Sequence, residues 1–357
     1  MNLTFITRKV DYGDPLAGFV ITWLNKLASK FENVYVICQE LGDTNGLPAN
    51  VLVRSFGKEK GHGKLRQAYG LLAECFRQAK KTDGFFIHMH PVYAILAWLP
   101  AKLFHKKMVL WYTHKSVDLK LRIAHVLVDA VLTASPESFR LTSKKVKIFG
   151  HGIDLEKFSA KGGPASGGKV KDGKFRIISI GRISPVKDYE TLIKAAEILR
   201  DSGVSDFIVE IYGKIGLPRH QGYYDDLVEF VKNAELEDYV KFQGELDYEY
   251  VDEAYREADL FVNLSQTGSI DKTVLESAAS KTLVLTSNEA FAIPLSKIDP
   301  LLFFERDNPE DLAARIIKIK ILPDEVRLKL QNELRSLVEE NHNLDNLVKK
   351  IAEEFKA

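Results

Sequence analysis

Two cations lie in the turn of the segment IISIGRISPVKDYETLIKAAEILR, residues 177–200, which begins as an apolar strand and ends as an amphipathic helix. Gly181 follows the strand, and Arg182 and Lys187 lie in the turn before the helix. Arginine offers a planar fork of donors and lysine a mobile point charge, so the pair suits the oxygens of a diphosphate. A glycine beside them lets the backbone approach a ligand closely. Taken alone, the two residues could also be solvated cations in a surface loop.

A second segment, NLSQTGSIDKTVLESAASKTLVLTSN at residues 263–288, has the same strand–loop–helix pattern. Gly268 and Ser269 lie in the loop, and Asp271 is placed to cap the helix that follows. Free N–H groups at a helix start form an anion site together with the helix dipole. Glu276 lies about one turn into the helix, where it could accept hydrogen bonds from sugar hydroxyls or be an ordinary surface glutamate.

Short apolar strands alternate with helical patterns along the whole chain, which is typical of parallel α/β sheets. At 357 residues, two domains are expected. We place the first at 1–158 and the second at 175–343, joined by the Gly-, Ser- and Lys-rich linker 159–174. The expected strands are 3–7, 33–38, 85–89, 107–113, 130–135, 145–150, 175–181, 207–213, 240–245, 260–265 and 283–287. The expected helices are 17–30, 64–81, 92–104, 118–127, 188–202, 222–235, 248–257 and most of the chain after 309.

Charge is divided unevenly between the two halves. Residues 1–155 contain 22 Lys and Arg but 12 Asp and Glu, a net +10, whereas the whole chain carries +1. The basic half could face an anionic partner such as a membrane face or a phosphorylated acceptor, or it could only carry uneven solubilising charge. The near-zero total and the lack of a recognition motif argue against nucleic acid.

The location expected from the sequence is cytoplasmic, with the inner face of a membrane as a further option. Cys38 and Cys75 are too few for a disulfide framework. The N-terminus lacks a signal-peptide pattern, and the longest apolar run, 92–104, is too short to span a bilayer.

The loop KEKGHGKLR, 58–66, does not have the first glycine and the Ser/Thr at the positions that a phosphate-binding loop requires, so we interpret it as a basic surface loop. With Lys102, Lys106 and Lys107 it could touch lipid headgroups or a lipid-diphosphate acceptor.

Five segments in order resemble the retaining glycosyltransferases of family 4: FGHGIDLEKF, GRISPVKDYETLIKA, IVEIYGKIG, YREADLFVNLS and LESAASKTLVLTS. The resemblance implies the GT-B fold, an α/β architecture of two Rossmann-like domains facing across a cleft. It also implies that the C-terminal helix, 344–357, packs back on the first domain. The second domain would bind a nucleotide-sugar donor and the first an acceptor.

The resemblance assigns roles residue by residue. Arg182 and Lys187 would hold the diphosphate and stabilise the leaving group, and Glu276 would bind the ribose hydroxyls. His114, at the end of a strand, matches a histidine that sits over the donor sugar. Gly181, Gly213 and Lys214 would border the nucleotide pocket, and the loop and helix start at Gly268, Ser269, Asp271, Lys272 and Thr273 would meet the donor.

The chain departs from the family pattern in two places. Gly268 stands where the first of two family glutamates is expected, so donor recognition must differ, and Asp271 is either its replacement or a helix cap. The turn after the first strand lacks the family's double glycine, and we assign acceptor contacts there to Asp14 and Gly18. His88 and His90 lack a further ligand with metal spacing, so a structural or acceptor-lining role is expected.

The function predicted is transfer of a sugar, with retention, from a UDP- or GDP-sugar to a hydroxyl of a glycan, a lipid-linked molecule or a small molecule. No cofactor and no metal is expected, because two cations and a helix start supply positive charge. A non-catalytic nucleotide-sugar-binding protein of the same fold is the alternative. A dinucleotide-dependent oxidoreductase is disfavoured, since neither domain's first strand is followed by G-x-G-x-x-G.

Overall fold

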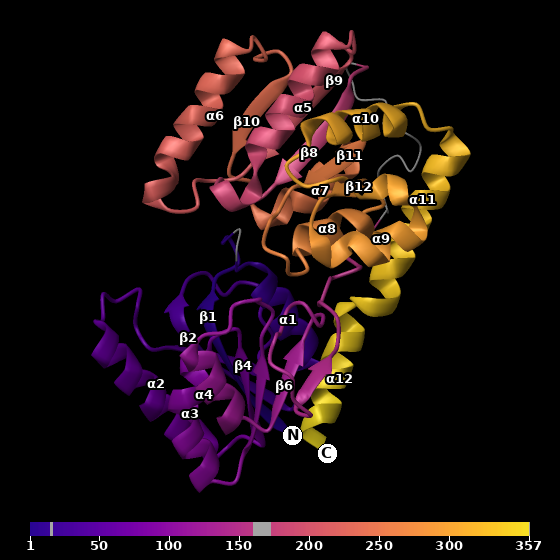
Figure 1. The fold of residues 1–357 in the computed structure, drawn as a ribbon. Helices are drawn as coiled ribbons and strands as arrows, with labels where there is room; N and C mark the ends of the chain where they lie inside the picture. The colour runs from indigo at the N-terminus through magenta and orange to yellow at the C-terminus, as the bar shows by residue number, and fades with distance from the viewer. Residues whose placement is uncertain (15–16, 160–172, 357) are drawn as a thin grey trace. The chain divides into compact units, whose positions relative to one another are not determined.

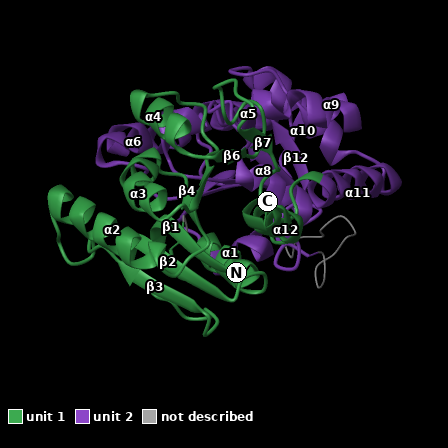
Figure 2. Cartoon of the chain, turned by 90° about the horizontal axis from the view of Figure 1, so that it is seen from below, with its two compact units in different colours: residues 1–154, 341–357 green, residues 155–340 purple. Residues whose placement is uncertain are grey.

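The computed structural model describes residues 1–14, 17–159 and 173–356. These form two compact units (Figures 1 and 2): unit 1 contains Met1–Asp154 and Asn341–Ala357, and unit 2 contains Leu155–Glu340. Most of the linker predicted at 159–174 lies outside the described residues.

Unit 1 is built on a seven-stranded sheet in which every neighbouring pair is parallel. Its strands are β1 (Asn2–Val10), β2 (Asn33–Leu41), β3 (Val51–Ser55), β4 (Gly84–His88), β5 (Lys107–Trp111), β6 (Ala130–Thr133) and β7 (Val146–Ile148). Their order is β3-β2-β1-β4-β5-β6-β7, with β1 near the centre. The sequence predicted all of them except β3, a short edge strand in which only Val51 is buried.

Helices cover both faces of this sheet (Figure 2). They are α1 (Phe19–Ala28), α2 (Lys64–Ala79), α3 (Pro91–Leu103), α4 (Leu119–Leu127) and α12 (Leu344–Lys356). Consecutive side chains of a strand point to opposite faces, so Phe5 packs into the core under α1 and α12, and Ile6 into the core under α2, α3 and α4. The C-terminal helix α12 adds Leu347 and Ile351 to the first core and is an integral part of unit 1.

The chain passes between the units near His151 and His342, both of which are buried. The backbone N–H of His151 donates to Nδ1 of His342 at 2.9 Å, and Ile153 pairs with Asn343. Gly150 has φ +79°, and a Cβ there would lie 1.6 Å from the carbonyl oxygen of Asn341. Only glycine fits this turn.

Replacing His342 with asparagine is expected to weaken the acid sensitivity of folding. Burial lowers the pKa of His342 to about 4 from the ordinary 6.5. Between these values the unfolded chain binds the proton and the folded chain does not, so stability falls as the pH drops from 6.5 to 4, by up to about 3 kcal/mol. The asparagine side chain of H342N keeps an acceptor for the N–H of His151 but does not titrate.

Urea unfolding at pH 7.0 and 5.0 measures this effect. The H105N variant, at an exposed position, should keep the wild-type difference between the two pH values. An unchanged difference in H342N would show that another group causes the acid sensitivity.

Unit 2 is built on a five-stranded parallel sheet with the order β10-β9-β8-β11-β12. Its strands are β8 (Phe175–Ile180), β9 (Phe207–Tyr212), β10 (Val240–Gly244), β11 (Leu260–Asn263) and β12 (Leu283–Thr286). Its α-helices are α5 (Tyr189–Asp201), α6 (Gln221–Asn233), α7 (Val251–Glu257), α8 (Lys272–Ala279), α9 (Ala292–Ile298), α10 (Pro309–Lys320) and α11 (Asp324–Asn341). Short 3₁₀ turns lie between them, among them η1 (Pro185–Lys187).

In both sheets the first strand lies inside the sheet and the strand order reverses beside it, as in Rossmann-like domains (Figure 1). The predicted α/β class with two such domains is confirmed. In the described part of the chain, no helix combines the length and the apolar character needed to cross a membrane.

Candidate active site

The candidate site of unit 2 lies at the carboxyl edge of its sheet, where β8 is flanked by β9 and β11. In open parallel sheets this is the edge that binds ligands. Gly181 ends β8, and its N–H donates to the carbonyl of Tyr212 at 2.9 Å. Gly213 follows β9, and a Cβ there would lie 1.9 Å from the carbonyl oxygen of Gly181. The two turns therefore touch through backbone alone, and glycine at 213 is a steric requirement.

Lys187 forms an ion pair with Asp271 in this site. Lys187 Nζ lies 2.5 Å from Asp271 Oδ2, and the side chains are only 14% and 17% exposed. Asn263 Nδ2 donates to the same oxygen at 3.2 Å, and Thr273 Oγ1 to the other at 3.3 Å. Burial raises the pKa of Asp271, but Lys187 and the hydrogen bonds outweigh it and hold the pKa below its ordinary value. Asp271 is thus a carboxylate that holds the ammonium of Lys187 in place.

The sequence left two roles open for Asp271, replacement of the missing family glutamate or capping of the helix, and its contacts bear on the second. Asp271 occupies the N-cap position of α8 and its carbonyl accepts from Val274 N, but its side chain makes no capping hydrogen bond. The predicted N-cap position of Asp271 is therefore confirmed, but its side chain does not cap the helix through a hydrogen bond. The carboxylate is directed instead to Lys187, because Asn263 and Thr273 orient both of its oxygens.

Arg182 differs from Lys187 in being exposed. Within residues 1–14, 17–159 and 173–356, its guanidinium makes no ion pair with a carboxylate. The loop that follows β11 reaches this turn, since Gln266 N donates to the carbonyl of Val186 at 2.9 Å. The site therefore combines a guanidinium open to a ligand with an ammonium that a carboxylate already holds.

Glu276 lies one turn into α8 and is 6% exposed, so the alternative of an ordinary surface glutamate is wrong. Burial raises the pKa of Glu276, while Lys272, whose Nζ is 3.7 Å from Oε1, acts in the opposite direction. Burial also lowers the pKa of Lys272. A buried carboxyl beside one cation can accept hydrogen bonds from hydroxyl groups.

The remaining predicted donor residues lie around these groups. Gly268 has φ +61°, and the buried Oγ of Ser269 has no hydrogen-bond partner among the described residues. Lys214 Nζ pairs with Glu245 at 2.5 Å on the surface, next to Gly213. The structure thus brings the predicted residues of unit 2 to one sheet edge. The sequence analysis missed Asn263. As a polar residue at the end of the apolar strand LFVN, it could have been predicted to lie at the ligand-binding edge of the sheet.

His114 lies in the loop after β5, at the carboxyl edge of the unit 1 sheet, and is exposed. The N–H of Ser116 donates to Nδ1 of His114 at 3.1 Å. Partial burial, and then the charge of Lys115, lower the pKa of His114 below its ordinary value. The neutral ring is therefore favoured, and because Nδ1 accepts from Ser116, its proton lies on Nε2, which can donate a hydrogen bond.

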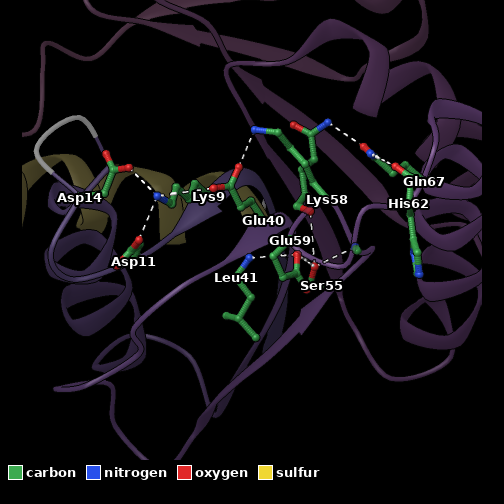
Figure 3. Close-up of polar contacts among 12 residues, drawn as sticks. Lys9, Asp11, Asp14, Glu40, Leu41, Ser55, Lys58, Glu59, His62 and Gln67 are labelled. Carbon is green, nitrogen blue, oxygen red and sulfur yellow. Dashed lines mark hydrogen bonds and ion pairs between the residues drawn. The ribbon is translucent and has the colours of Figure 1, made fainter. Parts of the chain in front are cut away.

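Asp14, a predicted acceptor residue, belongs to a cluster of charges at the ends of β1 and β2 (Figure 3). Lys9 Nζ lies 2.6 Å from Asp14, 2.9 Å from Asp11 and 3.5 Å from Glu40. Burial lowers the pKa of Lys9, but the two aspartates raise it above its ordinary value. Gly18 N donates to the carbonyl of Asp14, so both residues stabilise the start of α1.

The structural interpretation of His88 is confirmed. Its Nδ1 lies 3.2 Å from Thr7 Oγ1, and its buried ring packs against Phe5 and Trp23. His90 is half-buried against Tyr93. Across the residues that the structure describes, no group of three or more His, Cys, Asp or Glu is arranged to hold a metal ion.

A profile of the family described as glycosyl transferases group 1 matches residues 166–351, just over half of the chain. The chain is a member of glycosyl transferases group 1. The predicted glycosyltransferase family is therefore confirmed at the level of this group, and the match covers Arg182, Lys187 and Glu276.

Two enzymes are similar to this chain in sequence. The chain is 28% identical over 176 residues to the alpha-monoglucosyldiacylglycerol synthase of Streptococcus pneumoniae. The aligned residues are 48% of the chain and 37% of that enzyme. The chain is 26% identical over 223 residues to the mannosylfructose-phosphate synthase of Agrobacterium fabrum. This second alignment includes 56% of the chain and 48% of that enzyme. The matches thus span less than half the length of either relative.

Solved structures resemble the glycosyltransferase over nearly its whole length. Anabaena Alr3699/HepE in complex with UDP and glucose has a TM-score of 0.78 at 17% identity and covers 99% of both chains. A glycosyltransferase from Rickettsia africae ESF-5 has a TM-score of 0.76 at 16% identity, and the match covers 99% of the present chain and 98% of that protein. The chain therefore has the GT-B fold of these proteins.

Proposed function

We propose that this glycosyltransferase is a family 4 enzyme that transfers a sugar, with retention, from a nucleotide-diphosphate sugar to a hydroxyl acceptor. The proposal rests on one observation above all: Arg182 and the Lys187–Asp271 pair stand together at the carboxyl edge of the unit 2 sheet, beside the start of α8. An exposed guanidinium, an ammonium and the N–H groups at a helix start are donors that suit a diphosphate.

In the reaction that we propose, the bond between the anomeric carbon and the donor phosphate breaks as negative charge grows on the departing diphosphate. Arg182 and Lys187 stabilise that charge, so no metal ion is needed for it. The acceptor oxygen forms its bond to the anomeric carbon on the face that the diphosphate leaves. The hydroxyl proton passes to the departing phosphate oxygen, which makes the products a glycoside and a nucleoside diphosphate.

The other predicted residues have supporting roles. Glu276 accepts hydrogen bonds from the ribose, and Gly213 and Lys214 border the base. His114 donates from Nε2 to a hydroxyl of the donor sugar. Acceptor contacts by Asp14 and Gly18 belong to the same proposal, in which the carboxylate of Asp14 is released from Lys9 or binds together with it.

A UDP-sugar is the donor we favour, because solved structures of the same fold hold UDP, UDP with glucose, and UDP-glucose. The acceptor is a glycan or lipid-linked hydroxyl, in line with the diacylglycerol glycoside made by one relative. Such an acceptor would place the enzyme at the cytoplasmic face of a membrane through its basic first domain.

UDP at 1 mM is expected to raise the melting temperature of the protein, with GDP and ADP giving smaller shifts. A ligand that binds only the folded state adds about 2.7 kcal/mol of stability at one hundred times its dissociation constant, which corresponds to several degrees. Thermal-shift measurements with each nucleotide, with and without EDTA, test donor class and metal need together. A shift that vanishes with EDTA would contradict metal-independent binding, and the absence of any shift would contradict the donor site.

A further inference from the structure

Three helices on one face of unit 1 carry a strongly basic composition. Helices α2, α3 and α4 lie side by side on the sheet (Figure 2) and pack on one shared core. Together they contain six Lys and Arg but a single acidic residue, Glu74, which pairs with Arg77 at 2.9 Å. This helical layer therefore accounts for half of the excess of positive charge in residues 1–155.

The same layer exposes large apolar side chains. Leu65 is 90% exposed, Tyr69 74% and Val126 72%. The outer side of α3 shows Trp98, Leu99 and Leu103. A mixture of cations with exposed aliphatic and aromatic groups on one face is the composition of a membrane-surface helix rather than of a purely solvated one.

A cavity of about 570 Å³ opens where α2 and α3 end. Its walls consist of three apolar and three basic side chains: Phe76, Leu103, Phe104, Arg77, Lys80 and Lys81. Phe76 and Phe104 are half-buried, whereas the lysines are exposed. None of these wall residues is acidic, and the described part of the chain provides no ion pair for either lysine. The cavity thus combines three apolar side chains with three positive charges, one of which also pairs with Glu74.

We propose that this cavity binds the phosphate headgroup of an anionic phospholipid in a bilayer, with the α2–α3–α4 layer lying on the membrane. Arg77, Lys80 and Lys81 hold the phosphate, and Phe76, Leu103 and Phe104 contact the first part of the acyl chains. The cavity is at the amino-terminal end of β4 and β5, whereas His114 follows the carboxyl end of β5, so lipid bound there is an anchor and not the acceptor.

The choice of a bilayer over a free anionic amphiphile follows from the apolar groups outside the cavity. Leu99 and Leu103 are four residues apart on α3 and share one side of the helix, and Trp98 lies beside them. A single bound molecule would leave Leu99 and Trp98 in water, whereas a bilayer covers them together with the cavity. Tryptophan is also enriched at the level of lipid headgroups.

Co-sedimentation with vesicles tests the proposal on the full chain without nucleotide. We expect binding to vesicles of phosphatidylcholine with 30% phosphatidylglycerol and at least tenfold weaker binding to pure phosphatidylcholine. The variant K80E/K81E should bind the anionic vesicles at least tenfold more weakly, since two charges facing the lipid are reversed. The variant L99S/L103S should weaken binding even at low salt, where the charges act most strongly.

The matched control is K30E/K349E, which makes the same change in net charge at exposed lysines on the α1 and α12 side of the sheet. It should change vesicle binding by less than threefold. Equal loss in K30E/K349E would overturn the proposed cavity, and unchanged binding of K80E/K81E, with wild-type melting temperatures, would do the same. Binding of monomeric dihexanoyl phosphatidylglycerol without binding of vesicles would overturn the bilayer as the occupant.

This inference rests on the membrane contact within the proposed function and not on the donor site. Its readout contains no sugar or nucleotide, so loss of vesicle binding with a preserved UDP thermal shift would separate failure of the anchor from failure of the glycosyltransferase assignment.

Discussion

Replacement of Lys187 with alanine is expected to lower the rate of sugar transfer by about two to three orders of magnitude, and Arg182→Ala by a similar factor. Both cations face the diphosphate in the proposed site, where charge develops as the glycosidic bond breaks. The Lys187→Ala change also leaves Asp271 without its 2.5 Å partner, so a negative charge then stands where the diphosphate must bind. Transfer of sugar from the donor identified by thermal shift is the measurement.

The ion pair gives this prediction a sharper form. In K187A/D271N neither the ammonium nor the bare carboxylate is present, so the double variant should recover part of the activity that K187A loses. Such recovery is non-additivity between contacting residues. A merely structural lysine would give K187A and K187A/D271N similar rates and lower melting temperatures.

The matched control is K194A, which removes an exposed lysine from α5 that pairs with Glu190 on the surface. Its transfer rate should stay within twofold of wild type. Near-normal rates in both K187A and R182A would refute the role of these residues in stabilising the leaving group.

The fold was predictable because each element obeys local rules. Central strands such as β1 and β8 are rich in buried apolar residues, and the helices repeat apolar residues at helical spacing. The edge strand β3 was missed because it is short and only Val51 in it is buried. It therefore lacks the longer run of apolar residues that marks a strand in the core of a sheet.

The sequence allowed us to predict which residues line the site, but not which of them contact one another. That Arg182 and Lys187 come to one sheet edge follows from the rule that turns after parallel strands meet there. The pairing of Lys187 with Asp271, 84 positions later, depends on the packing of β8 beside β11, and it carries no signal in either local sequence. The burial of Glu276 likewise depends on how α8 packs against β11 and β12, since a helix position alone does not reveal which side is covered.

Replacement of Glu276 with glutamine is expected to remove the preference of the enzyme for a ribose 2′-hydroxyl. If the buried carboxyl accepts a hydrogen bond from that hydroxyl, wild type should bind UDP about tenfold more tightly than 2′-deoxy-UDP, since a hydrogen bond to a charged group contributes about 1.5–3 kcal/mol. In E276Q the two nucleotides should bind alike, and UDP should bind about as weakly as 2′-deoxy-UDP binds wild type. Calorimetric titration of both proteins with both nucleotides measures the coupling.

The comparison between nucleotides separates a ribose contact from a structural role. Glutamine removes the charge that accompanies Lys272, whose Nζ is 3.7 Å away, so E276Q is also expected to be less stable. Lost stability weakens both nucleotides equally, whereas a lost ribose contact weakens only UDP. The control K272M breaks the same buried pair from its other side and should lower stability while keeping the preference for UDP. If K272M loses that preference as fully as E276Q does, or if wild type does not distinguish the two nucleotides, Glu276 does not hold the ribose and serves only to balance Lys272 inside the domain.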